Sequence, residues 1–242
     1  MENVTRLFDL LDKYATNYPA KPMLHSKVKG EWVGRTATEI KEQSYQLAAS
    51  FLRMGISPHS FHPEEQNKIA IIANNRTEWL VTDFAVQCCG AVLVPLYPSI
   101  TASEWEYILN ESQISVLFIS DRFIYKKVKL IKDNIPTLKN IYCFDETEGV
   151  THWTELLVPY SESEAKQIDI IKQSVLPEYL ATIIYTSGTT GNPKGVMLSH
   201  NNIMSNVRCC MEAFGFCDSD ERTVSFLPLN HIFERTDRKS VV

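Results

Sequence analysis

The sequence predicts an α/β protein in which mostly parallel sheets are flanked by helices. Short, largely apolar segments recur along the chain, as strands of a parallel sheet covered on both faces require. These segments are 69–72, 91–96, 114–119 and 141–144. Stretches of helical length separate them, and one begins with the capping-box pattern Thr-Ala-Ser-Glu at 101–104. Repeating strand and helix predicts right-handed crossovers and a doubly wound sheet.

Composition narrows the class of protein. Of 242 residues, 44% are hydrophobic, which is ample for a sizeable core, and 22% are charged, which is ordinary for a globular protein. The net charge of −5 disfavours nucleic acid as the main partner, because a phosphate backbone is met by an excess of basic residues. Six cysteines without a C-x-x-C motif indicate reduced thiols and a cytoplasmic location. No apolar segment approaches the roughly 20 residues that span a bilayer, and peripheral membrane contact stays open.

The elements before the first apolar strand are a helix, a hairpin and a second helix. Apolar residues recur at helical spacing over residues 7–14, and prolines end that helix. The pair at 29–30, Lys-Gly, lies between two short extended segments and predicts a hairpin. The second helix begins near residue 38 and ends at Gly55.

Three groups of reactive side chains have ordinary explanations. His59 and His62 lie in a proline-containing loop with no cysteine or further histidine nearby, which disfavours a metal site. The lysines of 126–132 alternate with apolar residues, as on the solvated face of a surface helix. Adjacent cysteines at 88–89 and 209–210 could bridge only through a strained ring, so we expect them to pack as small hydrophobes.

The least regular stretch is 147–178, rich in Ser, Glu and Pro. It contains a short helix candidate at 153–157, and we expect it to connect two subdomains.

The strongest chemical pattern is at 185–195, Tyr-Thr-Ser-Gly-Thr-Thr-Gly-Asn-Pro-Lys-Gly. One apolar strand leads into it and another leads out. Its three glycines let the backbone curl around a ligand, its four hydroxyls and backbone N–H groups donate hydrogen bonds, and Lys194 adds a cation. Donors and a cation without a carboxylate predict a site for a polyanion, most plausibly a nucleoside triphosphate.

Two other interpretations of this loop are weaker. A Walker A loop has Gly-Lys-Ser/Thr after a glycine and four further residues. Here that position holds Pro193, and Gly195 follows Lys194, so the spacing excludes a kinase or GTPase P-loop. A hairpin loop without a ligand seldom combines three glycines, four hydroxyls and a lysine.

After the loop, we expect a helix capped by Ser199 or Asn201. Residues 224–227, Val-Ser-Phe-Leu, predict a strand that ends at Pro228 and directs His231 towards the loop. A histidine after a strand is often a satisfied core group, and a strand-end position favours a pocket role.

Residues 185–195 resemble, residue for residue, the signature loop of the adenylate-forming (AMP-binding) enzymes, which include acyl-CoA synthetases, luciferases and peptide-synthetase adenylation domains. Residues 226–235, Phe-Leu-Pro-Leu-Asn-His-Ile-Phe-Glu-Arg, resemble the Pro-Leu-x-His-x-x-Glu-Arg segment typical of long-chain fatty acyl-CoA synthetases. The resemblance implies that residues 1–236 are the N-terminal part of that fold, with a subdomain break at about 147–178.

The resemblance also implies a two-step reaction. A fatty acid carboxylate attacks the α-phosphate of ATP to give an acyl-adenylate, and coenzyme A then displaces AMP. The implied phosphate-binding residues are Thr186, Ser187, Gly188, Thr189, Thr190, Gly191 and Lys194, and Thr186 is also the family's position for a Mg²⁺ contact. Lys194 would stabilise the leaving pyrophosphate, and His231 would line the acyl pocket or orient the carboxylate.

Other family motifs are expected beyond His231: an aromatic-Gly-x-Thr-Glu segment, a ribose-binding Asp, a hinge and a C-terminal catalytic lysine. We therefore expect an N-terminal fragment that is inactive alone, with residues 237–242 an artefactual or disordered tail. Two alternatives stay open: adenylation of another carboxylic acid, and a truncated nucleotide-binding module without catalysis.

Overall fold

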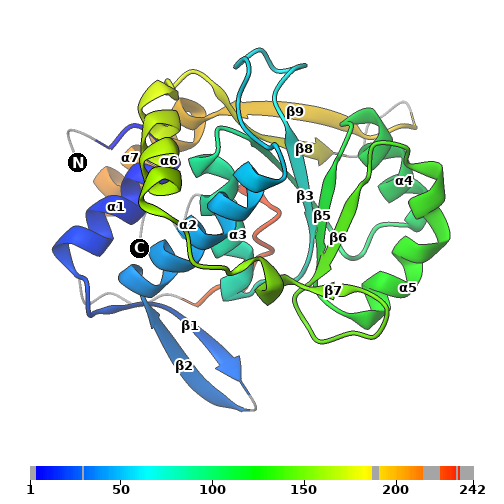
Figure 1. Ribbon diagram of the computed structural model, residues 1–242, viewed down its shortest axis with the longest axis horizontal. Helices are drawn as coiled ribbons and strands as arrows, with labels where there is room; N and C mark the ends of the chain where they lie inside the picture. The colour runs from blue at the N-terminus through cyan, green and yellow to red at the C-terminus, as the bar shows by residue number, and fades with distance from the viewer. Residues whose placement is uncertain (1–3, 29, 187–190, 215–223, 233, 235–242) are drawn as a thin grey trace.

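The computed structural model describes residues 4–28, 30–186, 191–214, 224–232 and 234. It contains a seven-stranded sheet, a separate two-stranded hairpin, and helices on both faces of the larger sheet (Figure 1). The predicted α/β class with a mostly parallel sheet is confirmed.

The strands of the large sheet lie in the order β7-β6-β5-β3-β4-β8-β9. They are β3 (Lys68–Ile72), β4 (Val92–Leu96), β5 (Val116–Ile119), β6 (Asn140–Cys143), β7 (Thr151–His152), β8 (Leu180–Thr186) and β9 (Lys194–Ser199). Every neighbouring pair is parallel except β8 and β9, which are antiparallel. β8 joins the sheet beside β4, where Leu93 is the register partner of Thr182.

Helices connect the parallel strands and cover the two faces of the sheet. α3 (Thr77–Cys88) follows β3, α4 (Ala102–Glu111) follows β4, and α5 (Arg122–Ile131) follows β5. In Figure 1, α4 and α5 lie on one side of the sheet and α3 on the other. The capping box at the start of α4 is confirmed, because Thr101 Oγ1 accepts from Glu104 N at 3.2 Å and Glu104 Oε2 accepts from Thr101 N at 2.8 Å.

The core has two layers because successive side chains of β3 point to opposite faces. Ile69 and Ile71 pack with the layer on the α3 side. Ala70 and Ile72 pack with the layer on the α4 and α5 side. Burial on both faces explains why the strand sequence is a continuous apolar run rather than an alternating one.

The predicted opening elements are present. α1 (Leu7–Asn17) precedes the hairpin of β1 (Pro22–Val28) and β2 (Glu31–Thr36), and α2 (Ala37–Arg53) follows. A reciprocal capping box starts α2, in which Glu39 N donates to Thr36 Oγ1 at 3.1 Å and Thr36 N donates to Glu39 Oε2 at 2.7 Å. The predicted helix after the loop is α7 (His200–Phe214), and Ser199 Oγ accepts from Asn202 N at 3.1 Å at its start.

The stretch 147–178 is more regular than predicted. It contains β7, the short 3₁₀ helix η2 (Trp153–Leu156) and the thirteen-residue helix α6 (Glu162–Ser174). Another 3₁₀ helix, η1 (Lys132–Asn134), lies before this stretch and follows α5. η2 matches the short helix expected at 153–157, whereas α6 was missed. Much of α6 is polar and exposed, with Ile168 and Ile171 buried, so its apolar periodicity is weak. The capping box of Ser161 and Glu164 was the available signal.

The other reactive groups mostly follow their simple explanations. Cys88 and Cys89 are buried as predicted, whereas Cys209 is exposed and does not pack as expected. Lys126 and Lys127 lie on the exposed face of α5. In the described part of the chain, no helix has the length and apolar content needed to cross a membrane. The proposed tail, 237–242, lies outside the described residues.

Candidate functional site

The signature loop connects two strands that pair directly with each other. In the β8–β9 hairpin, Thr186 is the register partner of Lys194, and both residues are exposed. The hydroxyl-bearing residue and the cationic residue are therefore opposite each other where the loop begins and ends. The predicted loop residues 187–190 (Ser187, Gly188, Thr189 and Thr190) lie outside the described residues.

Two glycines of the motif have geometric reasons to be glycine. Gly191 has a φ of +103°, in the left-handed region that side chains disfavour, and a Cβ there would meet nothing within 4 Å. At Gly195, a Cβ would lie 2.7 Å from Ile183 Cγ2 and 3.1 Å from the Tyr185 ring. Gly191 thus allows the turn of the loop, and Gly195 leaves room for the side chains of Ile183 and Tyr185 on the neighbouring strand β8.

A cavity of about 390 Å³ lies beside the loop, where β4 and β8 end. Its lining comes from the end of β4 and the segment after it, from α4, from the end of β8, from the signature loop and from two residues of the segment 224–232. The lining residues are Pro95, Leu96, Tyr97, Ile100, Glu104, Ile108, Ile184, Tyr185, Thr186, Pro193, His231 and Ile232. Ligands of open α/β sheets characteristically bind at the carboxyl ends of the strands, and this cavity has that position.

The cavity unites some predicted site residues and leaves others outside its lining. Thr186 and His231 both line it, and so does Pro193 from the signature loop. Gly191 and Lys194 are not lining residues; Lys194 instead lies across the hairpin from Thr186. The structure therefore brings together one phosphate-loop hydroxyl and the histidine of the second motif.

The walls of the cavity are mainly apolar, and its polar groups are few. Burial raises the pKa of the Tyr97 phenol, which stays protonated at neutral pH. Hydrogen bonds from the Thr101 backbone N–H and hydroxyl lower the pKa of Glu104, at distances of 2.8 and 2.7 Å. Glu104 is thus an ionised carboxylate already engaged in the cap of α4. A cavity of this kind suits an apolar ligand with one polar end.

His231 lies in a turn that follows a buried leucine. Its backbone N–H donates to Pro228 O at 2.8 Å, and Leu229 is 3% exposed within the core layer on the α3 side. The side chain of Asn230 is also buried and accepts a hydrogen bond from Trp79 Nε1 at 3.2 Å. His231 itself is exposed at the edge of the cavity.

The strand predicted for 224–227 is wrong. These four residues lie outside any strand, and Val224 and Phe226 are 74% and 78% exposed. His231 nevertheless reaches the predicted neighbourhood of the loop, because the β3–α3 turn holds this segment.

Sequence reasoning missed the wall contributed by β4 and α4, including Tyr97, Ile100 and Ile108. Tyr97 directly follows an apolar strand of the predicted parallel sheet. That strand-end position was the available signal. The signal was weak, because several strands end in the same way and the pattern alone does not give their order in the sheet.

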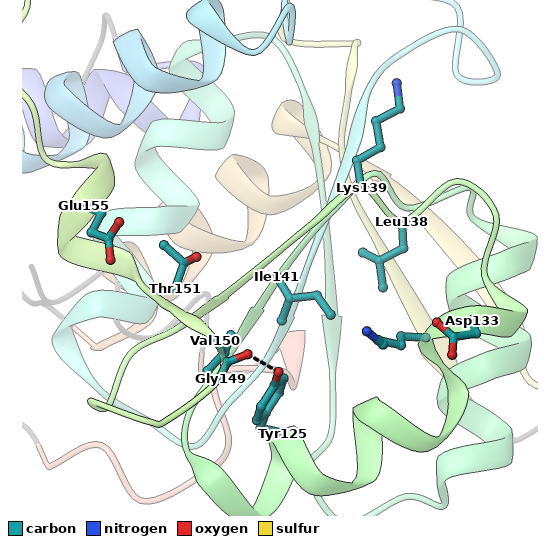
Figure 2. Close-up of a pocket in the computed structure, with 10 residues that line it drawn as sticks. Tyr125, Asp133, Leu138, Lys139, Ile141, Gly149, Val150, Thr151 and Glu155 are labelled. Carbon is teal, nitrogen blue, oxygen red and sulfur yellow. Dashed lines mark hydrogen bonds between the residues drawn. The ribbon is translucent and has the colours of Figure 1, made fainter.

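A second cavity, of about 560 Å³, lies at the β6–β7 edge and has a different character (Figure 2). Both cationic and anionic side chains line it, among them Asp133, Lys139 and Glu155. In Figure 2, Lys139 extends away from Asp133 and Tyr125, and the Tyr125 hydroxyl donates to Gly149 O. Because its charges do not converge and it contains none of the predicted site residues, the smaller cavity is the candidate site.

Comparisons with known proteins identify the family. The AMP-binding enzyme family matches residues 11–237. The long-chain-fatty-acid–CoA ligase ACSBG2 of Xenopus laevis is 27% identical over 93% of this chain and 31% of its own length. Long-chain-fatty-acid–CoA ligase 5 of Rattus norvegicus is 32% identical over 81% of this chain and 30% of its own length.

The same fold is found in the crystal structure of a long-chain-fatty-acid-CoA ligase (FadD1) from Archaeoglobus fulgidus. Its TM-score is 0.78 at 24% identity, over 97% of this chain and 44% of that one. The chain spans 31% and 37% of the length of the first two curated relatives it matches. The family match covers nearly the whole chain and includes both sequence motifs. This chain therefore belongs to the AMP-binding enzyme family.

Proposed function

We propose that this chain is the N-terminal part of a long-chain fatty acid–CoA ligase. In that reaction, ATP activates a fatty acid as an acyl-adenylate, and coenzyme A takes up the acyl group. The observation that carries the proposal is that Thr186 and His231 line one mainly apolar cavity beside the signature loop. Relatives named as long-chain-fatty-acid–CoA ligases give the substrate class.

The phosphates of ATP would lie along the signature loop. The described loop residues fit a polyanion, since Thr186 lies opposite Lys194 and Gly191 allows a sharp turn with open space beside it. The proposed phosphate-binding set is Thr186, Ser187, Gly188, Thr189, Thr190, Gly191 and Lys194. The Lys194 ammonium would stabilise negative charge on the leaving pyrophosphate.

Magnesium would be held partly by the Thr186 hydroxyl. Mg²⁺ prefers oxygen ligands and usually shares them with substrate phosphates, so one protein hydroxyl beside a phosphate loop fits it. When bound, the ion neutralises phosphate charge. Glu104, the lining residue with a carboxylate, is already engaged by Thr101.

The fatty acid would place its alkyl chain among the apolar walls, with its carboxylate near His231. One carboxylate oxygen then forms a bond to the α-phosphorus while the bond to the β-phosphate oxygen breaks and pyrophosphate leaves. In the second step, the coenzyme A thiol loses its proton to solvent, its sulfur forms a bond to the acyl carbon, and AMP leaves with the electron pair of the broken carbon–oxygen bond. His231 holds the carboxylate in line during the first step.

The proposal assigns substrate binding, rather than full turnover, to these 242 residues. Because the chain spans about a third of its relatives' length, the coenzyme A step and the ribose contacts are assigned to parts of the family's length that it does not cover. A cytoplasmic location belongs to the same proposal.

A binding competition tests the proposed substrate class. The chain is loaded with cis-parinaric acid, a fluorescent fatty acid, and titrated with decanoate, acetate, benzoate or aspartate, while ATP binding is measured separately by calorimetry. We expect decanoate to displace the probe and the three other acids to leave it bound. Displacement by benzoate or aspartate at lower concentration than decanoate would assign another acid. ATP binding without any carboxylate binding would favour a nucleotide-binding module without catalysis.

A further inference from the structure

The segment that carries His231 is held by a side chain that lies far away in the sequence. Asn75 lies in the turn between β3 and α3, and its carboxamide spans two residues of this segment. Asn75 Nδ2 donates to Leu227 O at 2.6 Å, and Asn75 Oδ1 accepts from Leu229 N at 2.7 Å. The carboxamide therefore makes the two bonds that a neighbouring strand would make.

The Asn75 carboxamide also forms a hydrogen bond to a side chain of the same segment. Asn75 Nδ2 also donates to Ser225 Oγ at 2.8 Å. The same serine hydroxyl donates to Glu234 Oε1 at 2.5 Å, and Glu234 is 1% exposed. Asn75 thus connects the residues before and after His231 in one hydrogen-bonded chain.

Two further contacts come from the start of α3 and from the same turn. Trp79 Nε1 donates to Asn230 Oδ1, and Asn230 Nδ2 donates to Ala73 O at 3.4 Å. Trp79 and Asn230 are both buried. The residue immediately before His231 is therefore held both by the turn that contains Asn75 and by the first residues of α3.

These polar contacts matter because apolar burial holds only part of the segment. Leu229 is buried, whereas Val224 and Phe226 are mostly exposed. Within the described range 224–232, no residue belongs to a strand. Since the ordinary backbone ladder is missing here, the Asn75 carboxamide is the group that satisfies the backbone on both sides of Pro228.

We infer that Asn75 is a positioning residue that holds His231 at the cavity and thereby sets the preference of the site for a carboxylate. This inference rests on the proposed function, in which His231 orients the carboxylate of a fatty acid. Binding of the alkyl chain and selection of the acidic end group are then carried out by different parts of the site. The cavity walls bind the alkyl chain, and the Asn75-held segment selects the acidic end group.

The discriminating measurement is the ratio of two dissociation constants. Decanoate and decanol have the same alkyl chain, so general damage to the cavity weakens both, whereas misplacement of His231 weakens decanoate alone. Each ligand displaces cis-parinaric acid from the 242-residue chain. We expect Asn75→Leu to reduce the preference for decanoate about tenfold, because a misplaced His231 no longer forms its hydrogen bond to the charged carboxylate.

Matched variants isolate the cause. Asn110 also donates its amide to two backbone carbonyls, Glu106 O at 3.0 Å and Asn134 O at 3.1 Å, and neither Asn110 nor either acceptor residue lines the cavity. Asn110→Leu should keep the preference. Asn75→Asp keeps the acceptor for Leu229 N and loses the donors, so it should show an intermediate loss and covers the case in which Asn75→Leu does not fold.

A double-variant cycle tests whether Asn75 acts through His231. The variant carrying both Asn75→Leu and His231→Ala should prefer decanoate no less than His231→Ala alone. Full additivity of the two losses, or equal weakening of decanoate and decanol by Asn75→Leu, would overturn the inference.

A spectroscopic readout keeps the inference separable from the proposed function. If the wild-type chain shows no preference for decanoate, the proposed function fails. The placement of His231 is then judged from its ¹³Cε1 resonance in histidine-labelled protein, assigned with His231→Gln. A shift in Asn75→Asp but not in Asn110→Leu supports positioning by Asn75, and an unchanged resonance in Asn75→Asp contradicts it.

Discussion

Thr186 and His231 line the same cavity, although one ends a strand of the sheet and the other lies in a turn near the last described residues. Thr186 marks the place where the signature loop begins, opposite Lys194. His231 marks the edge of a mainly apolar space. The two motifs therefore meet where a phosphate-bearing ligand and an apolar ligand would be adjacent, as the joining of a carboxylate to ATP requires.

Lys194→Ala should weaken ATP binding without unfolding the chain. The side chain is exposed, so its removal leaves the core unchanged, while a charge-assisted contact to phosphate is lost. We expect a loss of about 1.5–3 kcal/mol in binding free energy, measured by calorimetry with ATP. Lys166→Ala is the matched control, since that exposed lysine pairs with Glu162 on α6. An ATP affinity equal to wild type in Lys194→Ala would remove Lys194 from the phosphate site.

Ile100→Trp should fill the cavity and exclude the alkyl chain. Ile100 lines the cavity and is only partly buried, so a larger ring can occupy the space without replacing a core residue. We expect decanoate affinity to fall at least tenfold while ATP affinity stays within about twofold, a change of roughly 0.4 kcal/mol. Ile170→Trp is the control, because Ile170 is 65% exposed on α6. Undiminished decanoate binding by Ile100→Trp would place the acyl site elsewhere.

Gly195→Val should destabilise the β8–β9 hairpin. A Cβ at this position would lie 2.7 Å from Ile183 Cγ2, so the two strands must separate or the side chain of Ile183 must move. Overpacking of this kind costs about 1–3 kcal/mol in free energy of unfolding, measurable by urea denaturation. Met197→Val, at a 60% exposed position of β9, tests whether any change in this strand has the same effect. Wild-type stability of Gly195→Val would contradict the close approach.

Asp12→Asn should make the fold less stable at neutral pH and reduce the acid dependence of stability. Asp12 accepts from Lys172 Nζ at 2.6 Å, and Lys172 also donates to the Tyr45 hydroxyl at 2.8 Å. Although burial raises the pKa of Asp12, hydrogen bonds from Lys172 and Lys41 outweigh it, and the pKa lies below the ordinary value. Replacement of Asp12 takes from Lys172, which is 7% exposed, the carboxylate with which it forms an ion pair.

The sign of the pH effect follows from the lowered pKa. A carboxyl group with a lower pKa in the folded state contributes stability above its unfolded pKa of about 3.9 and loses it as the pH falls. The difference in free energy of unfolding between wild type and Asp12→Asn should be about 1–3 kcal/mol at pH 7, discounted for partial exposure, and should shrink below pH 4. Asp133→Asn, at an exposed aspartate, should show neither effect. A difference independent of pH would contradict the ion-pair account.

Local patterns predicted those parts of the structure that local interactions determine. The apolar strands, the capping box at Thr101 and the hairpin around the signature loop follow from residue order alone. α6 was missed because much of its surface is exposed, and its buried face depends on packing against α2. Its Lys172 reaches Asp12 and Tyr45 in two other helices, which no local pattern reveals.

The segment at 224–227 shows why an apolar run is an incomplete signal for a strand. Val224 and Phe226 favour extended structure, but the partner of this backbone is the side chain of Asn75, far away in the sequence. The same long-range contact decides where His231 lies. Motif matching identified the histidine, and only the fold reveals which residues hold it and which walls it faces.

Photo-crosslinking would show whether the cavity shared by Thr186 and His231 binds the fatty acyl chain. A ten-carbon fatty acid with a diazirine near its methyl end is bound to the chain, irradiated and located by mass spectrometry. We expect crosslinks to cavity-lining residues such as Ile100, Ile108 or Ile232, and we expect excess decanoate to suppress these crosslinks. Crosslinks confined to other surfaces, such as the cavity at the β6–β7 edge, or insensitive to decanoate, would contradict it.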